Sequence, residues 1–179
     1  AIFSKPGSLG CLYDTCTSSL LYRPTEFKTY IGMVLGRPNL LREITYGNMR
    51  VSSVGAAVRF VDGSILVQRR SKAVTHAKNM LDSSVGGFCT LTPTGAIDPS
   101  VALKEKLDRE LRIGLEDIVS VRLTGVHSSS FPDLSGMCSY VVDTSLEPHS
   151  LSQRTNDKYI GESYVIPHDT LPEFIVKHY

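Results

Sequence analysis

The sequence predicts an α+β fold with a mixed sheet and an N-terminal extension. Three features carry this prediction: a hairpin-like segment at 51–70, one amphipathic helix near 99–112, and a return to strand-like segments after it. The chain has 179 residues, of which 41% are hydrophobic, which suits one domain with a short accessory segment. We therefore divide it into an N-terminal extension at 1–50 and a domain at 51–179.

The extension gives the weaker pattern. Residues 1–25 are rich in Ser, Gly, Thr and Pro and predict a loosely structured arm. The run at 29–36 is typical of a strand, whereas 38–50 fits a short helix or a hairpin equally well.

The domain begins with the clearest element. Two strands, at 51–61 and 64–70, flank Asp62-Gly63, a dipeptide that favours a type I′ hairpin turn. Asp98 is a candidate N-cap for the helix, because its side chain can accept hydrogen bonds from the first-turn amides. One face of that helix carries Leu103, Leu107 and Leu111 at a spacing of four. Strands are expected at 118–129, 137–145 and 162–167, and a short helix at 170–178.

Charge and composition exclude some classes of partner. Lys and Arg number 19 and Asp and Glu 18, a near-neutral balance that argues against nucleic acid bound through bulk charge. No apolar run could span a bilayer and no signal peptide is visible, so we expect no membrane partner and a cytoplasmic location. The chain starts at Ala1, so its start is no guide to targeting. The four cysteines fit neither a zinc ribbon nor a CxxC pair, and we expect them to be reduced.

Four segments together resemble the Nudix superfamily over about residues 51–176. They are ILVQRRS at 65–71, LDSSVGGF at 81–88, RELRI at 109–113 and ESYVIPHDTL at 162–171. In outline they are most similar to the branch that includes isopentenyl-diphosphate isomerase. The resemblance implies a Nudix-like α/β/α sandwich, a small-molecule substrate or ligand linked to a diphosphate, and a possible homodimer.

The resemblance also implies Mg²⁺ or Mn²⁺ held by glutamates of one helix, although this sequence keeps few of them. In one register, Arg109-Glu110-Leu111 is the Arg-Glu-apolar triplet of the family signature, and Val101, Ile113 and Gly114 replace its other glutamates. In the other register, which we prefer, Glu110 is the second of the signature's paired glutamates and Arg109 replaces the first. Lys106 then replaces an earlier glutamate of the signature, and Arg112 replaces its glycine. Both registers retain Glu110 as a metal ligand, and neither retains a full set.

Glu110 also has a simpler interpretation. It lies four residues after Lys106, so the two side chains can form an ion pair on an exposed helix face. The sequence therefore predicts either one remaining Mg²⁺ or Mn²⁺ ligand or no metal at all.

Other candidate site residues follow from the same segments. Arg69 and Arg70 are candidates for binding phosphate, and because neighbouring strand residues point to opposite faces, at most one should face the pocket. Gly86 and Gly87 mark a turn or a close approach of the backbone. By the resemblance, Gly86 and Phe88 stand where the isomerase has its catalytic cysteine and its metal-binding histidine, so isomerase chemistry of that kind is not expected.

Three further residues are candidates for acid–base chemistry. His76 and His127 could transfer protons near neutral pH, and Glu162 lies where family members carry an acid near the site. Each has a structural alternative, as an exposed or packed side chain.

The most favoured function is an atypical Nudix-fold enzyme with weak or no diphosphate hydrolase activity. It would use the pocket for non-hydrolytic cyclisation or isomerisation of a small molecule, or for binding alone. One alternative is a Mg²⁺- or Mn²⁺-dependent hydrolase of a nucleoside or prenyl diphosphate. Another is a non-catalytic protein-interaction module.

Overall fold

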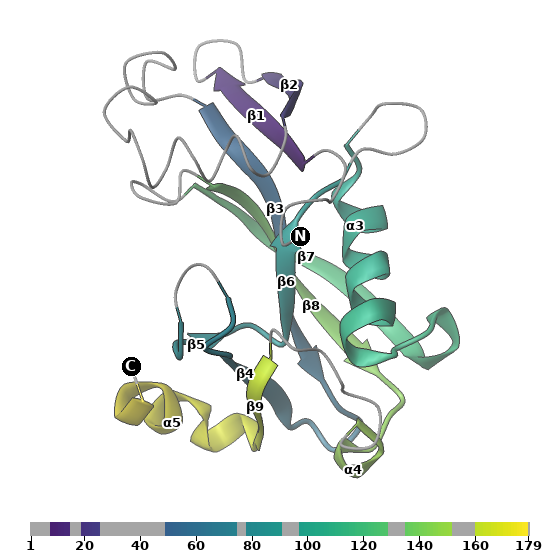
Figure 1. Ribbon diagram of the computed structural model, residues 1–179. Coiled ribbons are helices and arrows are strands. Elements are labelled where there is room, and N and C mark those ends of the chain that lie inside the picture. Colours follow the sequence, from purple (N-terminus) through teal and green to yellow (C-terminus); the bar gives the residue numbers. More distant parts are fainter. Residues whose placement is uncertain are drawn as a thin grey trace. The chain divides into compact units, whose positions relative to one another are not determined.

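The computed structural model describes residues 8–14, 19–25, 49–74, 78–90, 97–128, 135–151 and 160–178 (Figure 1). The chain divides into two compact units. The first comprises Ala1–Val54, Phe88–Ala102 and Gly125–Cys138, and the second comprises Gly55–Gly87, Leu103–Thr124 and Ser139–Tyr179.

The first unit contains a hairpin that the sequence did not predict. Strands β1 (Ser8–Asp14) and β2 (Ser19–Thr25) pair antiparallel along their whole length, from Ser8↔Thr25 to Asp14↔Ser19. β1 also pairs with the start of β3 (Met49–Arg59). The expectation of a loosely structured arm is therefore wrong for 8–14 and 19–25. The strand expected at 29–36 lies outside the described residues, and the ambiguous segment at 38–50 is described only at 49–50, where β3 begins.

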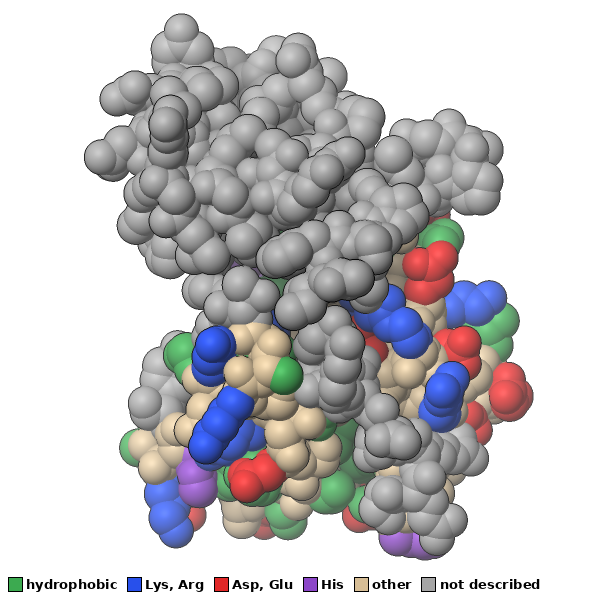
Figure 2. Space-filling view, viewed as in Figure 1, with side chains coloured by type: hydrophobic (Ala, Val, Ile, Leu, Met, Phe, Trp, Pro, Cys, Tyr) green, Lys and Arg blue, Asp and Glu red, His purple; other side chains and the backbone are tan. Residues whose placement is uncertain are grey.

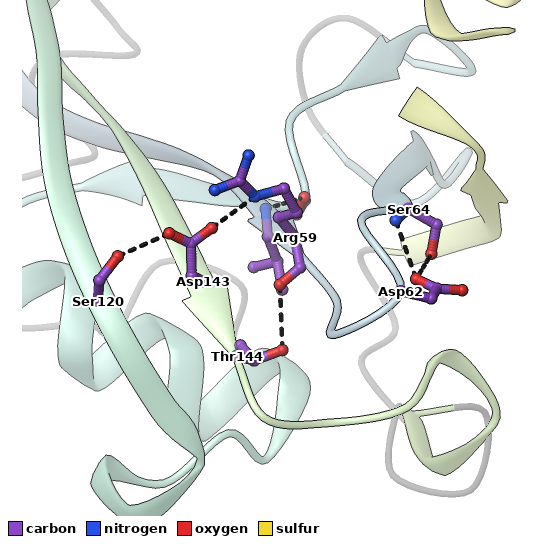
Figure 3. Close-up of polar contacts among 8 residues, drawn as sticks. Arg59, Asp62, Ser64, Ser120, Asp143 and Thr144 are labelled. Atoms are coloured by element: carbon purple, nitrogen blue, oxygen red, sulfur yellow. Dashed lines mark hydrogen bonds and ion pairs between the residues drawn. The ribbon is translucent and has the colours of Figure 1, made fainter. Parts of the chain in front are cut away.

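The hairpin of β3 and β4 (Ile65–Arg70) forms as predicted, but its turn is of another type. A type I′ turn needs a positive φ at both central residues, and of the pair only Gly63 has one, at +84°. The Phe60 amide donates to the Ser64 carbonyl, and the Gly63 amide donates to the Phe60 carbonyl, both at 2.9 Å. This pattern is a three-residue loop with glycine in the left-handed position. Asp62 Oδ1 accepts hydrogen bonds from the Ser64 amide and hydroxyl (Figure 3), which favours this turn.

The predicted helix is present with a wider final turn. α3 spans Pro99–Lys106 and continues as a π-helical turn over Leu107–Leu111. Asp98 caps it, since its Oδ1 accepts from the amide of Ser100 at 2.9 Å and from its hydroxyl at 2.6 Å. The helix ends at Arg112, whose φ of 54° is left-handed and whose amide donates to the Leu107 and Asp108 carbonyls.

Only some of the remaining elements were predicted. Two short strands, β5 (Leu81–Asp82) and β6 (Val85–Phe88), precede α3, and long strands β7 (Ile118–Ser128) and β8 (Ser135–Thr144) follow it. The chain then forms α4 (Pro148–Leu151), β9 (Ile160–Ile166) and α5 (Leu171–His178). Of these elements, β7, β8, β9 and α5 were predicted and occur in that order, whereas β5, β6 and α4 were not predicted. β4 pairs antiparallel with both β5 and β9, β6 and β8 pair with β3, and β7 pairs with β8.

The core of the second unit joins the helix to the sheet. The three leucines of the predicted apolar helix face, Leu103, Leu107 and Leu111, are all buried. Their buried companions come from β3, β4, β6, β8 and the end of the helix: Ala56, Val58, Leu66, Val85, Ile113 and Val142. This packing fixes the rotation of the helix, and with it the positions of Lys106 and Glu110.

Candidate functional site

Glu110 lies between two cationic side chains of its own helix. Its Oε1 is 3.7 Å from Lys106 Nζ and 2.6 Å from Arg109 Nη2. The Glu110 and Lys106 side chains are only 12% and 13% exposed, whereas Arg109 is about half exposed. The ion pair considered for Glu110 in the sequence is therefore present, but it is largely buried rather than on an exposed face.

Gly87 makes room for the Lys106 side chain. A Cβ added at Gly87 would lie 2.6 Å from Lys106 Nζ and 2.9 Å from its Cε. The Gly87 φ of +148° is also one that other residues rarely adopt. The close backbone approach expected at the Gly86-Gly87 pair is thus made at Gly87, and the group that approaches is the lysine ammonium.

A second cluster joins β4 to β9. Arg69 pairs in register with Glu162, and its Nε donates to Tyr164 Oη at 3.1 Å and lies 3.4 Å from Glu162 Oε2. The Tyr164 hydroxyl in turn donates to Glu162. The hydrogen bond to Tyr164 raises the pKa of the Arg69 guanidinium. Arg69 Nη1 also donates to the Asn79 carbonyl at 2.8 Å, so several partners fix this side chain.

Arg69 and Arg70 contact different strands. Arg70 Nη1 lies 2.8 Å from Asp82 Oδ2 on β5, whereas Arg69 binds residues of β9. Gln68, on the same strand, is buried. Among the described residues, its Nε2 is the buried side-chain polar atom without a hydrogen-bond partner.

The structure places the remaining candidates separately. Gly86 and Phe88 are half-buried in β6. His127 is exposed on the part of β7 that belongs to the first unit, beside Gly125. His76 lies outside the described residues. The structure thus brings Glu162 to Arg69, while Glu110 meets Lys106 and Arg109.

Lys106 and Tyr164 are the residues whose importance the sequence analysis missed. The sequence suggested Lys106 only as a residue that replaces a glutamate of the family signature and as an ion-pair partner of Glu110. Nothing in its local sequence indicates that its side chain is buried. Tyr164 could have been found from the strand pairing, since it lies two residues from Glu162 and so shares its face.

A surface hollow at the β3–β4 turn contains none of these candidates. It has a volume of about 300 Å³ and is lined by Asp62, Gly63, Ser64, Pro167, His168 and Asp169. Hydrogen bonds from Ser64 lower the pKa of Asp62, so this carboxylate is ionised near neutral pH. With two aspartates in its lining, the hollow is poorly suited to a phosphorylated ligand.

The charge distribution on the surface is mixed. In the face shown in Figure 2, basic and acidic side chains are interspersed where atoms are coloured by type. Within the described ranges, no helix has both the length and the apolar character needed to cross a membrane.

The residues around Glu110 do not fit a divalent metal ion. Mg²⁺ and Mn²⁺ prefer several oxygen ligands, whereas this carboxylate faces an ammonium and a guanidinium group. Across the part of the chain that the structure describes, no three His, Cys, Asp or Glu side chains group together as metal ligands.

Solved structures with a similar fold include two proteins of the Nudix and MutT type. DR0079 of Deinococcus radiodurans, a hypothetical Nudix protein, is 24% identical with a TM-score of 0.56, covering 72% of this chain and 74% of its own. The MutT protein of Methanosarcina mazei is 17% identical with a TM-score of 0.50, covering 69% of this chain and 81% of its own. The chain therefore has the Nudix α+β fold, as the sequence predicted. No protein-family model matches the chain, and no curated protein does.

Proposed function

We propose that this protein uses its Nudix fold to bind a small molecule that carries a diphosphate, with weak or no metal-dependent hydrolysis. The single observation that carries the proposal is the environment of Glu110. Its carboxylate is held by Lys106 and Arg109 and is largely buried, so it is poorly placed to bind a divalent cation. A carboxylate held in this way suits a protein that only binds its ligand, or one that carries out an isomerisation or cyclisation that consumes no water.

The end of the helix supports the preferred register of the family signature. In that register Arg112 replaces a glycine, and Arg112 is one of two described non-glycine residues with a positive φ. A left-handed residue at the end of a helix is usually glycine. The backbone therefore favours the alignment in which Lys106 and Arg109 replace glutamates of the metal site.

Calorimetric titration with Mg²⁺ and Mn²⁺ tests the proposal. We expect no binding at millimolar metal, and no phosphate or pyrophosphate release from nucleoside or prenyl diphosphates. The same titration is made with Glu110→Gln, with Glu105→Gln as an exposed control on the same helix. Metal binding that Glu110→Gln abolishes and Glu105→Gln retains, together with phosphate release by the wild type, would refute the proposal in favour of a metal-dependent hydrolase.

A further inference from the structure

We infer that residues 118–124 of β7 form a homodimer interface, in which this edge of the sheet pairs antiparallel with the same edge of a second copy of the chain. The inference rests on the exposure, the sequence and the charges of β7, and it is independent of the proposed function. Residues 118–124 all belong to the second unit, as does the neighbouring part of β8, at 139–144.

The apolar side chains of β7 lie uncovered on one face of the strand. Val119, Val121 and Leu123 alternate along it and are 68%, 48% and 53% exposed. The residues between them, on the opposite face, are exposed as well. Among the described strands, β8 is the one that pairs with β7. Within the described ranges, β7 is therefore an edge strand with an uncovered apolar stripe.

The sequence of β7 carries few of the features that usually keep sheet edges apart. Exposed edges in proteins are commonly short, carry lysine or proline, or twist away at a bulge. β7 is 11 residues long, contains neither lysine nor proline, and has one arginine, Arg122. A long apolar edge of this kind is a template for pairing with another strand. A second copy of the chain is the partner that fits, because β7 is complementary to itself in one register.

Antiparallel pairing of β7 with its own copy has one register that matches every apolar side chain of the stripe. With the two-fold axis at Val121, this valine faces Val121 of the partner subunit, and Val119 faces Leu123 of the partner subunit. An axis one residue earlier would place Leu123 opposite Asp117, and an axis one residue later would place the two copies of Arg122 opposite each other. An axis between two residues would set the apolar face of one strand against the polar face of the other.

The polar face of β7 is complementary to itself in the same register. The Ser120 hydroxyl donates to Asp143 of β8 at 2.6 Å, and Arg59 Nε donates to the other carboxylate oxygen at 2.7 Å (Figure 3). Hydrogen bonds from Arg59 and Ser120 lower the pKa of Asp143, and the nearby charge of Arg122 adds to this effect. With the axis at Val121, Arg122 of the partner subunit stands opposite Ser120. The short serine side chain leaves room for that guanidinium to reach Asp143, so two equivalent ion pairs would join the subunits.

Sedimentation velocity of the full chain, over micromolar to submillimolar concentrations, tests the interface. We expect the wild type to dimerise in this range and Val121→Lys to have a dissociation constant at least about tenfold higher, because two like charges would face each other at the axis. Val176→Lys is the matched control, since Val176 is an exposed valine of α5, and it should associate as the wild type does. A wild type that stays monomeric throughout, as expected if a different protein covers β7, would overturn the inference. A dimer that Val121→Lys leaves intact would overturn it as well.

Cysteine cross-linking tests the register, and it decides the matter if circular dichroism shows that Val121→Lys does not fold. A bifunctional thiol reagent with a two-carbon spacer should join two copies of Val121→Cys, because residues 121 lie opposite each other. Val119→Cys is the control, since residues 119 of the two copies would lie four positions apart along the strands, roughly 13 Å. A mixture of Val119→Cys and Leu123→Cys should cross-link, and peptide mapping distinguishes these links from any made by native cysteines. No cross-linking of Val121→Cys, or equal cross-linking of Val119→Cys alone, would contradict the pairing.

Discussion

Ser84 bridges the two strands of the β3–β4 hairpin, and its removal should destabilise the fold. Its side chain is fully buried, and its Oγ accepts a hydrogen bond from the Val58 amide at 2.7 Å and donates one to the Leu66 carbonyl. In the β3–β4 hairpin Arg59 pairs with Ile65, and these two residues are the sequence neighbours of Val58 and Leu66. The serine hydroxyl thus joins the strands where the hairpin ladder is short.

The expected cost of Ser84→Ala follows from the two backbone groups that lose their partner. A buried donor or acceptor left unsatisfied costs about 1–3 kcal/mol. Leu66 also lies in the β4–β9 ladder, and its carbonyl oxygen has a second lone pair, so most of the loss falls on the Val58 amide. We therefore expect the free energy of unfolding to fall by about 2–3 kcal/mol, and Tm by about 5–10 °C for a chain of this size.

Urea titration followed by circular dichroism measures this loss. Ser145→Ala is the matched control, because the Ser145 hydroxyl also donates to a backbone carbonyl, that of Asp117, but is exposed. The control should change the free energy of unfolding by less than about 0.5 kcal/mol. If Ser84→Ala were as mild as Ser145→Ala, the buried hydroxyl would not be holding the two strands together.

Two further substitutions test the polar contacts and the helix end. Asp143 accepts hydrogen bonds from Arg59 Nε at 2.7 Å and from the Ser120 hydroxyl at 2.6 Å (Figure 3), and these lower the pKa of its carboxyl group. Its stabilising effect is therefore complete above the ordinary pKa of an aspartate, about 3.9, and is lost as the pH falls through the lowered value. Asp143→Asn should reduce the free energy of unfolding by about 1 kcal/mol at pH 7, and a difference from the wild type that stays as large at pH 2–3 would contradict this cause. Arg112→Gly should raise the free energy of unfolding by about 0.5–1 kcal/mol in urea titration, because it relieves a left-handed φ of 54°, and a loss of stability would contradict the argument.

The parts of the fold that the sequence predicted are those set by local patterns. The cap at Asp98 and the leucines at 103, 107 and 111 form as expected, because capping and helical spacing depend on neighbouring residues. The β1–β2 hairpin was missed because its strands contain Ser, Gly and Pro and lack regular alternation. The turn type was wrong because Asp-Gly fits two kinds of loop, and the hydrogen bond from Ser64 to Asp62 favours the longer one.

The site was harder to predict because its contacts join residues distant in sequence. Arg69 and Glu162 meet only because β4 and β9 pair in one register, which neither strand specifies alone. The approach of Lys106 to Gly87 depends on how far the helix is rotated over the sheet, and the buried leucines set that rotation. Sequence spacing alone gave the Lys106–Glu110 pair but placed it on an exposed surface, since burial is a property of the assembled core.

A metal ion and a lysine ammonium group differ in what they contribute to the binding and to the hydrolysis of a diphosphate. Mg²⁺ brings two positive charges and can activate a bound water molecule, whereas an ammonium group brings one charge and three hydrogen-bond donors. A phosphate can be held by either cation. An ammonium group carries no lone pair and does not activate water as a metal ion does. A site in which Lys106 and Arg109 stand in place of glutamates, as we propose, would lack the metal ion that activates water, and a protein that binds or isomerises its ligand does not need that step.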